Sequence, residues 1–254
     1  MWSLSSETVT VDLEPTPGSV HHPLDDAVRE ALRGVHAPFA QWRGSIGRYH
    51  PEVAGHLGHP PVLTDTDWAD LAEFVGPGER TTIRGFGHEI PKGWETVGGF
   101  DSVQLEGSGL KVDYDQEAVR LGASDVPEIL DLVERTKPGP YRVRTIEMGR
   151  YVGIRVDGRL VAMAGERLHP PGWTEISAVC TDSEFRGRGL ASRLVRDVGA
   201  GIRDRGEVPF LHALASNVTA ISLYEALGFT LRKRSHVAAV LTPSEHSPTL
   251  ASLT

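Results

Sequence analysis

The sequence predicts an α/β protein whose second half forms one mixed β-sheet with helices on both faces. Between Val119 and Val240, apolar runs typical of strands alternate with stretches of helical spacing in the order β-α-β-β-β-α-β-α-β. Asp157-Gly158 is a strong tight-turn signal between two of these strands. The helix expected over 189–205 places four apolar residues on one face, namely Leu190, Leu194, Val198 and Ile202.

The other elements of the second half follow from similar signals. Strands are expected at 119–121, 151–156, 160–168, 174–181, 208–214 and 229–240, and a second long helix at 217–227. The helix after the first strand is expected to begin at Asp125, with Pro127 in its first turn and Glu128 in the capping-box position. Gly228 is expected to end the helix over 217–227.

The first half is expected to be a smaller α/β domain over residues 21–108. It contains two helical patterns and two strand patterns, at 24–35, 66–75, 81–84 and 96–105. We also consider, by analogy alone, that it is a degenerate copy of the second half. The Gly- and Asp-rich stretch 106–116 is expected to link it to a second domain over 117–241. Residues 1–20 and 242–254 are expected to be polar, poorly ordered tails.

Composition excludes several classes of protein. The net charge of −8 argues against nucleic acid as the main partner. The 254 residues contain no apolar run long enough for a membrane span, and the N-terminus has no basic-then-apolar pattern of a secretory signal. The single cysteine, Cys180, excludes an internal disulfide and fits a cytoplasmic protein. We expect a monomer or a homodimer.

The most informative motif is Arg186-x-x-Gly189-x-Ala191, which joins a predicted strand to a predicted helix. Gly187 and Gly189 let the backbone approach a bulky anion, and the helix start aims free N–H groups at the same place. These features predict a diphosphate-binding turn made mostly of main chain. A dinucleotide fingerprint would need a third glycine, and a nucleotide P-loop would need Gly-Lys-Ser/Thr. A Gly-rich turn with no ligand remains an alternative for this motif taken alone.

A second motif follows at the expected spacing. Asn217-x-x-Ala220-x-x-x-Tyr224-x-x-x-Gly228-Phe229 lies on the last predicted helix. The two motifs in this order resemble the Gcn5-related N-acetyltransferases, the GNAT superfamily. The strand 175–181 and the closing Leu-Tyr-Glu-Ala-Leu-Gly-Phe are most similar to its FR47-like branch. The resemblance covers about residues 119–240. It implies the GNAT acyltransferase fold, with strands four and five splayed, and acetyl-CoA (coenzyme A) as cofactor. A primary amine of a small molecule or peptide would be the acceptor.

The resemblance also implies roles for individual residues. Pantetheine would contact the backbone of Val179 and Thr181. The diphosphate would lie on the turn formed by Arg186, Gly187, Arg188, Gly189, Leu190 and Ala191. Further cofactor contacts are expected from the last helix, at Asn217, Ala220 and Tyr224. Tyr224 would protonate the departing thiolate. Glu175 is similar to the strand glutamate that serves as general base in the histone-modifying branch of the superfamily.

Simpler interpretations stand beside these roles. Asn217 could serve only as a helix cap, Tyr224 as a core tyrosine and Glu175 as a salt-bridged strand residue. Glu166, His212 or a chain of waters could replace Glu175 as the base. Cys180 is expected to be a buried apolar residue rather than a nucleophile.

The remaining sequence features are less specific. His56-x-x-His59 is too sparse for a metal site, so no metal is expected. The acidic first half could steer a cationic acceptor, although a solvated acidic surface is the simpler explanation. Two other functions stay open: transfer of longer acyl groups, as in glycine-N-acyltransferase-like enzymes, and a non-catalytic acyl-CoA-binding regulatory module.

Overall fold

One mixed sheet of eight strands runs through the computed structural model, which describes residues 22–85 and 89–244. The strand order is β4-β11-β5-β10-β9-β8-β7-β6, and only β9 and β10 are parallel neighbours. The strands are β4 (Arg80–Arg84), β5 (Glu95–Glu106), β6 (Val119–Leu121), β7 (Tyr151–Val156), β8 (Arg159–Glu166), β9 (Trp173–Thr181), β10 (Val208–Leu214) and β11 (Thr230–Leu241). The mixed sheet predicted from the sequence is therefore confirmed.

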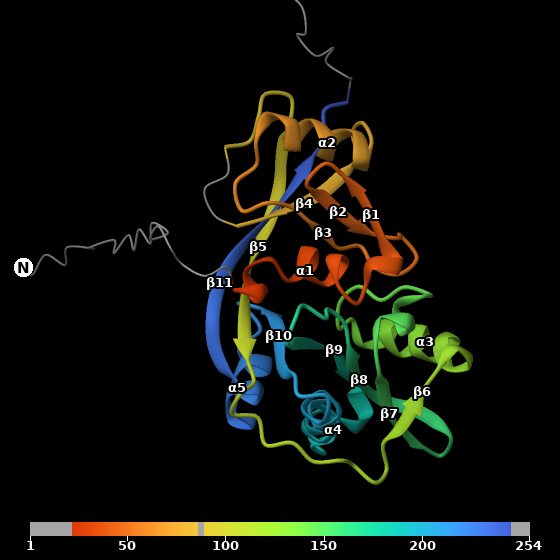
Figure 1. Ribbon diagram of the computed structural model, residues 1–254. Coiled ribbons are helices and arrows are strands. Elements are labelled where there is room, and N and C mark those ends of the chain that lie inside the picture. Colours follow the sequence, from red (N-terminus) through yellow and green to blue (C-terminus); the bar gives the residue numbers. More distant parts are fainter. Residues whose placement is uncertain (1–21, 86–88, 245–254) are drawn as a thin grey trace, which may run out of the picture.

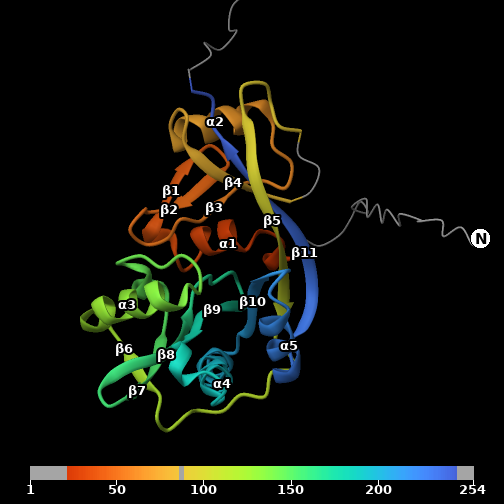
Figure 2. The same cartoon turned by 180° about the vertical axis from the view of Figure 1, so that it is seen from behind.

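Helices cover both faces of this sheet, as alternation along the strands requires. Val152 and Ile154 of β7 share one core with α4 (Leu190–Asp204) and α5 (Val218–Leu227). Tyr151, on the opposite face of β7, packs with α3 (Val126–Thr136). Figure 2 shows α4 and α5 next to one another below the long strands. None of the helices in the described ranges combines the length and apolar character needed to cross a bilayer.

The first half contains elements that the sequence patterns did not reveal. Besides α1 (Ala27–Arg33) and α2 (Asp65–Val75), it has a three-stranded antiparallel sheet of β1 (Ala40–Arg43), β2 (Ile46–Tyr49) and β3 (Leu57–Gly58). Five short 3₁₀ helices also occur among the described residues, η1 (Pro23–Asp26), η2 (Ala37–Phe39), η3 (Ala123–Asp125), η4 (Thr145–Met148) and η5 (Ser183–Phe185). The strands β1 to β3 are too short to produce a clear alternation. The element order of the first half differs from that of the second, so its described residues do not form a second copy of the fold.

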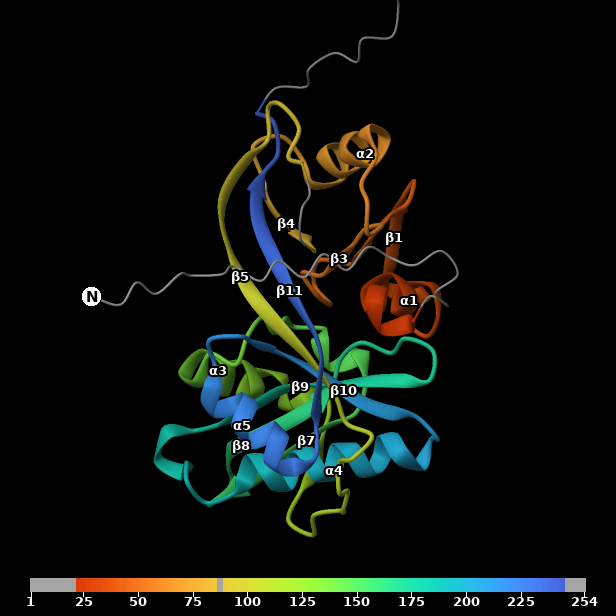
Figure 3. The ribbon, with the colours of Figure 1, turned by 90° about the vertical axis from the view of Figure 1, so that its left-hand side faces the viewer.

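Two strands of the first half belong to the sheet of the second. β5 lies between β10 and β11, where Val103 stands opposite Ala213 on one side and Arg234 on the other. β4 pairs with the outer edge of β11. Figures 1 and 3 show β5 and β11 running side by side from the lower half of the molecule into the upper half. The sheet therefore contains strands from both sides of the linker predicted at 106–116.

The start of α3 differs in detail from the sequence expectation. Asp125 makes no side-chain cap to the helix and instead accepts from the backbone N–H of Gly122 at 2.8 Å. Glu128 does not close a capping box, because its Oε1 accepts from the N–H of Leu160 at 2.6 Å. Arg155 reaches both carboxylates, at 2.8 Å to Asp125 and 2.5 Å to Glu128. The expected local cap is thus replaced by contacts that fasten α3 to the β7–β8 hairpin.

The first half is packed against the α3 face of the sheet. Apolar residues of α1 and β2, including Leu32 and Tyr49, share a core with Met148, Leu168 and Phe210. Phe210 and the next residue, Leu211, belong to different cores because neighbouring strand residues face opposite sides. The first half therefore stands over the face of β9 and β10 that is not covered by α4.

Candidate functional site

The parallel strands β9 and β10 separate after a short paired stretch. Their ladder joins residues 173–175 to residues 208–210 and ends at the pair Glu175 and Phe210. Both strands continue further, to Thr181 and Leu214. Beyond Glu175 no residue of β9 pairs with β10, and we call this unpaired stretch at the carboxyl ends of the two strands the notch. This is the splay of strands four and five that the resemblance implies.

β9 is distorted where it borders this notch. Met163 pairs with Cys180 and Gly165 with Ser177, so the register shifts by one residue between them. Ala178 adopts φ +53°, a left-handed conformation that costs a non-glycine residue roughly 1–2 kcal/mol. A bulge of this kind re-aims backbone groups and is common beside active sites. Thr181, at the end of the strand, has a buried hydroxyl without a hydrogen-bond partner in the described chain.

The turn after β9 has the properties predicted for anion binding. Gly187 and Gly189 have φ near +75°, and a Cβ added at either would meet open space. Gly189 is the N-cap of α4, and no side chain caps this helix start. Arg186 donates to the carbonyl of Thr181 at 3.3 Å, and Arg188 donates to that of Glu184 at 3.2 Å. Because β9 and β10 are parallel, the turn lies at the same edge of the sheet as the notch.

α5 begins at this same edge, directly after β10. Asn217 is its N-cap, and its Oδ1 accepts from the backbone N–H of Ala220 at 3.1 Å. The capping role considered for Asn217 is therefore present, and its amide nitrogen is not used by it. Tyr224 packs against the α4 core and makes an edge contact with Phe229. Burial raises the pKa of Tyr224 to about 12, so the phenol keeps its proton at neutral pH.

Glu175 is the last paired residue of β9 and is fully buried, with 0% of its side chain exposed. Arg167 donates to it twice, from Nε at 2.7 Å and from Nη2 at 2.6 Å. Nδ1 of His212 donates a third bond at 2.6 Å. Burial alone would raise the pKa of Glu175, but Arg167 and His212 hold it well below its usual range. The carboxylate is therefore ionised and occupied by three donors.

The other nitrogen of His212 faces a donor as well. Oε1 of Gln104 accepts from Arg232 at 2.7 Å, which leaves the amide nitrogen to face Nε2 of His212 at 3.1 Å. Since Glu175 can only accept and this amide nitrogen can only donate, His212 is the neutral tautomer with its proton on Nδ1. Burial also lowers the pKa of His212. The arrangement assigns His212 to a buried hydrogen-bond network.

Residues of the first half lie near the charged groups of Glu175 and Arg167. The electrostatic environment of His56 includes Arg167, Glu175 and Arg84, and burial lowers the pKa of His56 to about 3. Tyr49 is also under the influence of Glu175 and Arg167. The neighbourhood of Glu175 is thus built by both halves of the chain, with His56, Arg84 and Tyr49 coming from elements that the sequence did not connect to the site.

A small cavity adjoins the bulge on this face. It is lined by residues 138–141, Arg167, Ser177 and Ala178 and has a volume of about 20 Å³. A wider recess of about 320 Å³ shares three of these residues, Gly139, Pro140 and Tyr141. Residues 138–141 and Arg167 lie outside the sequence motifs, so the motifs did not reveal this cavity. Only the fold brings the α3–η4 loop next to the distorted part of β9.

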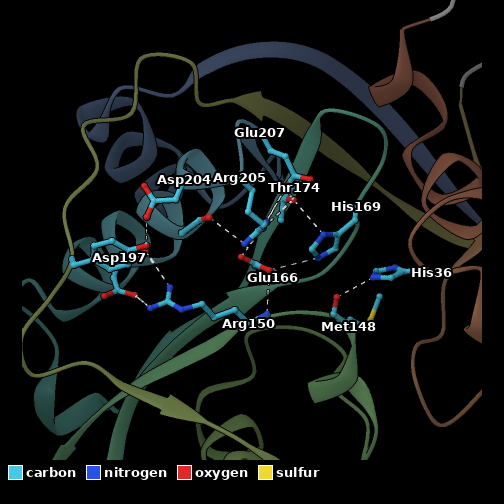
Figure 4. Close-up of polar contacts among 12 residues, drawn as sticks. His36, Met148, Arg150, Glu166, His169, Thr174, Asp197, Asp204, Arg205 and Glu207 are labelled. Carbon is cyan, nitrogen blue, oxygen red and sulfur yellow. Dashed lines mark hydrogen bonds and ion pairs between the residues drawn. The ribbon is translucent and has the colours of Figure 1, made fainter.

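Glu166, considered from the sequence as a reserve base, belongs to a different network (Figure 4). It is 2% exposed and accepts from the backbone N–H of Arg150 at 3.1 Å and from Nη2 of Arg205 at 3.0 Å. Nε2 of His169 faces it at 3.7 Å. These contacts tie the end of β8 to the start of β7 and to the end of α4. Their chemistry is that of a buried structural ion pair.

Comparison with known proteins agrees with this geometry. The family model described as FR47-like protein matches residues 151–238. N-alpha-acetyltransferase RimI of Mycobacterium tuberculosis is 38% identical over 90 residues, which cover 33% of this chain and 56% of that enzyme. The [ribosomal protein bS18]-alanine N-acetyltransferase of Salmonella typhimurium is 29% identical over 128 residues, 47% of this chain and 86% of that protein. The chain thus spans little more than half the length of the mycobacterial relative.

The splayed parallel pair, the bulge and the glycine turn define the acetyltransferase fold of the GNAT type. A crystal structure of a GNAT-family acetyltransferase from Novosphingobium aromaticivorans is 37% identical to this chain. It superposes with a TM-score of 0.78 over 87% of this chain and 98% of that one. The chain belongs to the GNAT family of N-acetyltransferases, which confirms the resemblance drawn from the two sequence motifs.

Proposed function

We propose that the protein transfers an acetyl group from acetyl-CoA directly to a primary amine. The observation that carries the proposal is the notch between β9 and β10, with the uncapped start of α4 and the start of α5 at the same edge of the sheet. Acetyl-CoA would supply an activated thioester there. The named relatives act as N-acetyltransferases, which supports an amine as the acceptor.

The chain offers suitable groups for each part of the cofactor. The backbone of Val179 and Thr181 borders the notch and suits the amide groups of pantetheine. The diphosphate suits the turn of residues 186–191, where helix N–H groups and the positive end of the helix dipole favour an anion. Arg186 and Arg188 would add charge-assisted contacts. Asn217 and Ala220, at the start of α5, complete the proposed binding surface.

Tyr224 is the proposed donor to the departing thiolate. Its phenol is protonated at neutral pH, because burial raises its pKa to about 12. A donor with so high a pKa gives up its proton only as negative charge develops on sulfur, whose own thiol pKa is near 8.5. We therefore expect a strong hydrogen bond to the leaving group, with a contribution on the order of 10²-fold to turnover.

The general base predicted at Glu175 stays a prediction. A carboxylate with a lowered pKa is a weak base, and three donors already occupy its oxygens. An amine that reaches the site in its neutral form, or a water that carries the proton away, would reduce the need for a strong base. Arg167 favours the neutral amine, since a nearby cation lowers the pKa of an ammonium group.

The test is release of free thiol from acetyl-CoA by the purified protein with a panel of primary amines. We expect thiol release that depends on the amine and falls roughly 10²-fold in Tyr224→Phe, with an unchanged melting temperature. Tyr114→Phe is the matched control, because that exposed phenol bonds Asp204 away from the notch. If the protein binds acetyl-CoA but releases no thiol with any amine, a non-catalytic module is favoured. If thiol is released faster from longer acyl-CoA thioesters, transfer of longer acyl groups is favoured.

A further inference from the structure

The cavity beside the β9 bulge is lined by several hydrogen-bond donors. Arg167, Tyr141 and Ser177 line it, and Ala178 of the bulge forms part of its wall. Its volume of about 20 Å³ is enough for one water-sized group. The wider recess shares Gly139, Pro140 and Tyr141 with the cavity and is also lined by Glu134 and Lys137; its volume of about 320 Å³ has room for the rest of a small molecule.

Arg167 uses only one edge of its guanidinium group for Glu175. The bonds to the carboxylate come from Nε and Nη2, at 2.7 and 2.6 Å. No hydrogen bond or ion pair joins its Nη1 to another residue within 22–85 and 89–244. The side chain is 17% exposed, and it borders the cavity. A buried guanidinium with one unused edge favours an oxygen ligand, since leaving its donors unpaired is costly.

Two phenols beside Arg167 also lack partners. The hydroxyl groups of Tyr141 and Tyr151 are buried and bond to none of the described residues. Their rings meet edge to face at 5.5 Å, and Tyr151 is only 1% exposed. Burial raises the pKa of both phenols, so they remain proton donors at any physiological pH. Buried hydroxyl groups without partners are uncommon and usually indicate a missing ligand or water.

No carboxylate is among the residues that line this cavity. The carboxylate of Glu175 is already occupied by Arg167 and His212, and that of Glu134, which lines the wider recess, pairs with Lys137. The other charged groups that face Glu175 from the first half and from β10 are Arg84, His56 and His212, and the two histidines are neutral. The cavity is therefore cationic and rich in donors. An ammonium group would be repelled there, whereas an anion would be bound.

We propose that this cavity binds a carboxylate oxygen of the amine acceptor, with Arg167 and the hydroxyl group of Tyr141 as its donors. The acceptor is then an amino acid, whose amine points toward the bulge of β9. Glu175 is a positioning residue that holds the guanidinium group of Arg167 at the cavity. This inference rests on the proposed acetyl transfer to an amine, and it names the class of acceptor.

The experiment compares matched acceptors that differ only by the carboxylate. Free L-amino acids, β-alanine and γ-aminobutyrate are each paired with the amine or the amide that lacks the acid group, and thiol release is measured. A charge-assisted contact predicts a preference for the acids of roughly 10- to 100-fold in kcat/KM. Tyr141→Phe, which retains the packing, should reduce that preference by raising KM for the acids alone.

Arg167 itself needs a variant that leaves no buried unpaired charge. Arg167→Gln alone would leave the ionised Glu175 buried without its main partner, which would destabilise the fold. The double variant Arg167→Gln/Glu175→Gln removes both charges and should abolish the preference, measured as the ratio of kcat/KM for each acid to that for its carboxylate-free partner. Arg167→Lys keeps the charge and should retain part of the preference.

The outcomes separate the inference from the proposed function. If the wild-type protein releases no thiol with any amine, the acetyl transfer itself is refuted. If it acetylates amines, but the acids and their amides react equally, the carboxylate site is refuted and the acetyl transfer stands. Equal acid preference in wild-type protein and in a folded Arg167→Gln/Glu175→Gln variant would also overturn the assignment.

Discussion

At Glu175, three donors share two carboxylate oxygens in a place that solvent does not reach. The same strand position would act as a base if it were open to the acceptor and carried an ordinary pKa. Here the partners decide otherwise: they stabilise the anion so strongly that it has little affinity for a proton. The neighbours of a residue determine its chemistry. Here both neighbours, Arg167 and His212, lie outside the sequence motif that contains Glu175.

Gly189 provides a direct test of the diphosphate turn. Gly189→Val should weaken coenzyme A binding by at least tenfold, about 1.4 kcal/mol, because a side chain would fill the open space over the turn. Calorimetric titration measures the affinity. Gly172→Val is the matched control, since Gly172 also has φ near +77° and open space around its Cβ but lies before β9.

The control isolates the cause of the effect. Both substitutions place a branched residue in a left-handed conformation and should lower the melting temperature by similar amounts. Only the variant in the turn should lose affinity. Unchanged affinity in a folded Gly189→Val protein would mean that the cofactor does not approach this turn.

Some residues of the candidate site lie in sequence motifs and others do not. Gly187, Gly189, Asn217 and Tyr224 lie in contiguous motifs whose spacing follows from a strand, a turn and a helix. Arg167 has no such signal. It lies in the loop between β8 and β9, and its proposed role depends on a cavity that it lines together with residues 138–141. Pairings between segments distant in sequence leave no local pattern to detect.

The bulge in β9 is the element that shapes the proposed acetyl site. Ala178→Gly should preserve it, because glycine adopts φ +53° without strain, and the free energy of unfolding should change by less than about 1 kcal/mol. Ala178→Val should destabilise the protein by roughly 1–2 kcal/mol, since a β-branched residue tolerates this conformation poorly. Thiol release should persist in the glycine variant and fall in the valine variant.

Melting temperature and turnover measured on the same samples decide this prediction. If Ala178→Val retains full turnover despite lower stability, the bulge does not shape the reacting site. If Ala178→Gly loses turnover without losing stability, the fixed conformation of the bulge is what matters, rather than the strain at Ala178.

The elements of the second half were predicted more accurately than those of the first for a physical reason. Helices such as α4 carry a periodic apolar face, and the β7–β8 hairpin has its Asp-Gly turn. β1 to β3 have two to four residues each and carry no period. The capping of α3 was predicted incorrectly because Glu128 is drawn to Leu160 and Arg155, contacts that only the folded hairpin provides.

At the scale of the whole molecule, the two halves meet at a buried histidine. His36 is 1% exposed, accepts from the hydroxyl of Tyr49 at 2.7 Å and donates to the carbonyl of Met148 at 2.9 Å. Figure 4 shows its ring directed at Met148. Burial lowers its pKa to about 4, so it stays neutral in the folded protein at mildly acidic pH.

This histidine makes the stability depend on pH. An unfolded chain binds a proton at His36 below about pH 6.5, whereas the folded chain does so only near pH 4. Stability should therefore fall as the pH drops from about 6.5 toward 4, by roughly 3 kcal/mol at the limit. His36→Gln should reduce the slope of the plot of melting temperature against pH in that window, while other histidines with lowered pKa values, such as His56 and His212, retain part of it.

His50→Gln is the control, because the side chain of His50 is 42% exposed, whereas His36 is buried. Its plot should run parallel to that of the wild-type protein. Carboxylates such as Glu175 add a further loss only at lower pH, as their own protonation begins. A His36→Gln plot that stays parallel to the wild-type plot between pH 6.5 and 4.5 would show that His36 does not control this dependence.

The position of β5 has a consequence for folding during translation. Glu106 at its end pairs beside Thr230, 124 residues further along the chain. When β5 leaves the exit tunnel, neither β10 nor β11 has been synthesised, so both of its edges are still unpaired. Such long-range pairing slows folding and leaves strand edges exposed to aggregation. The sheet therefore remains incomplete until β10 and β11 have been translated.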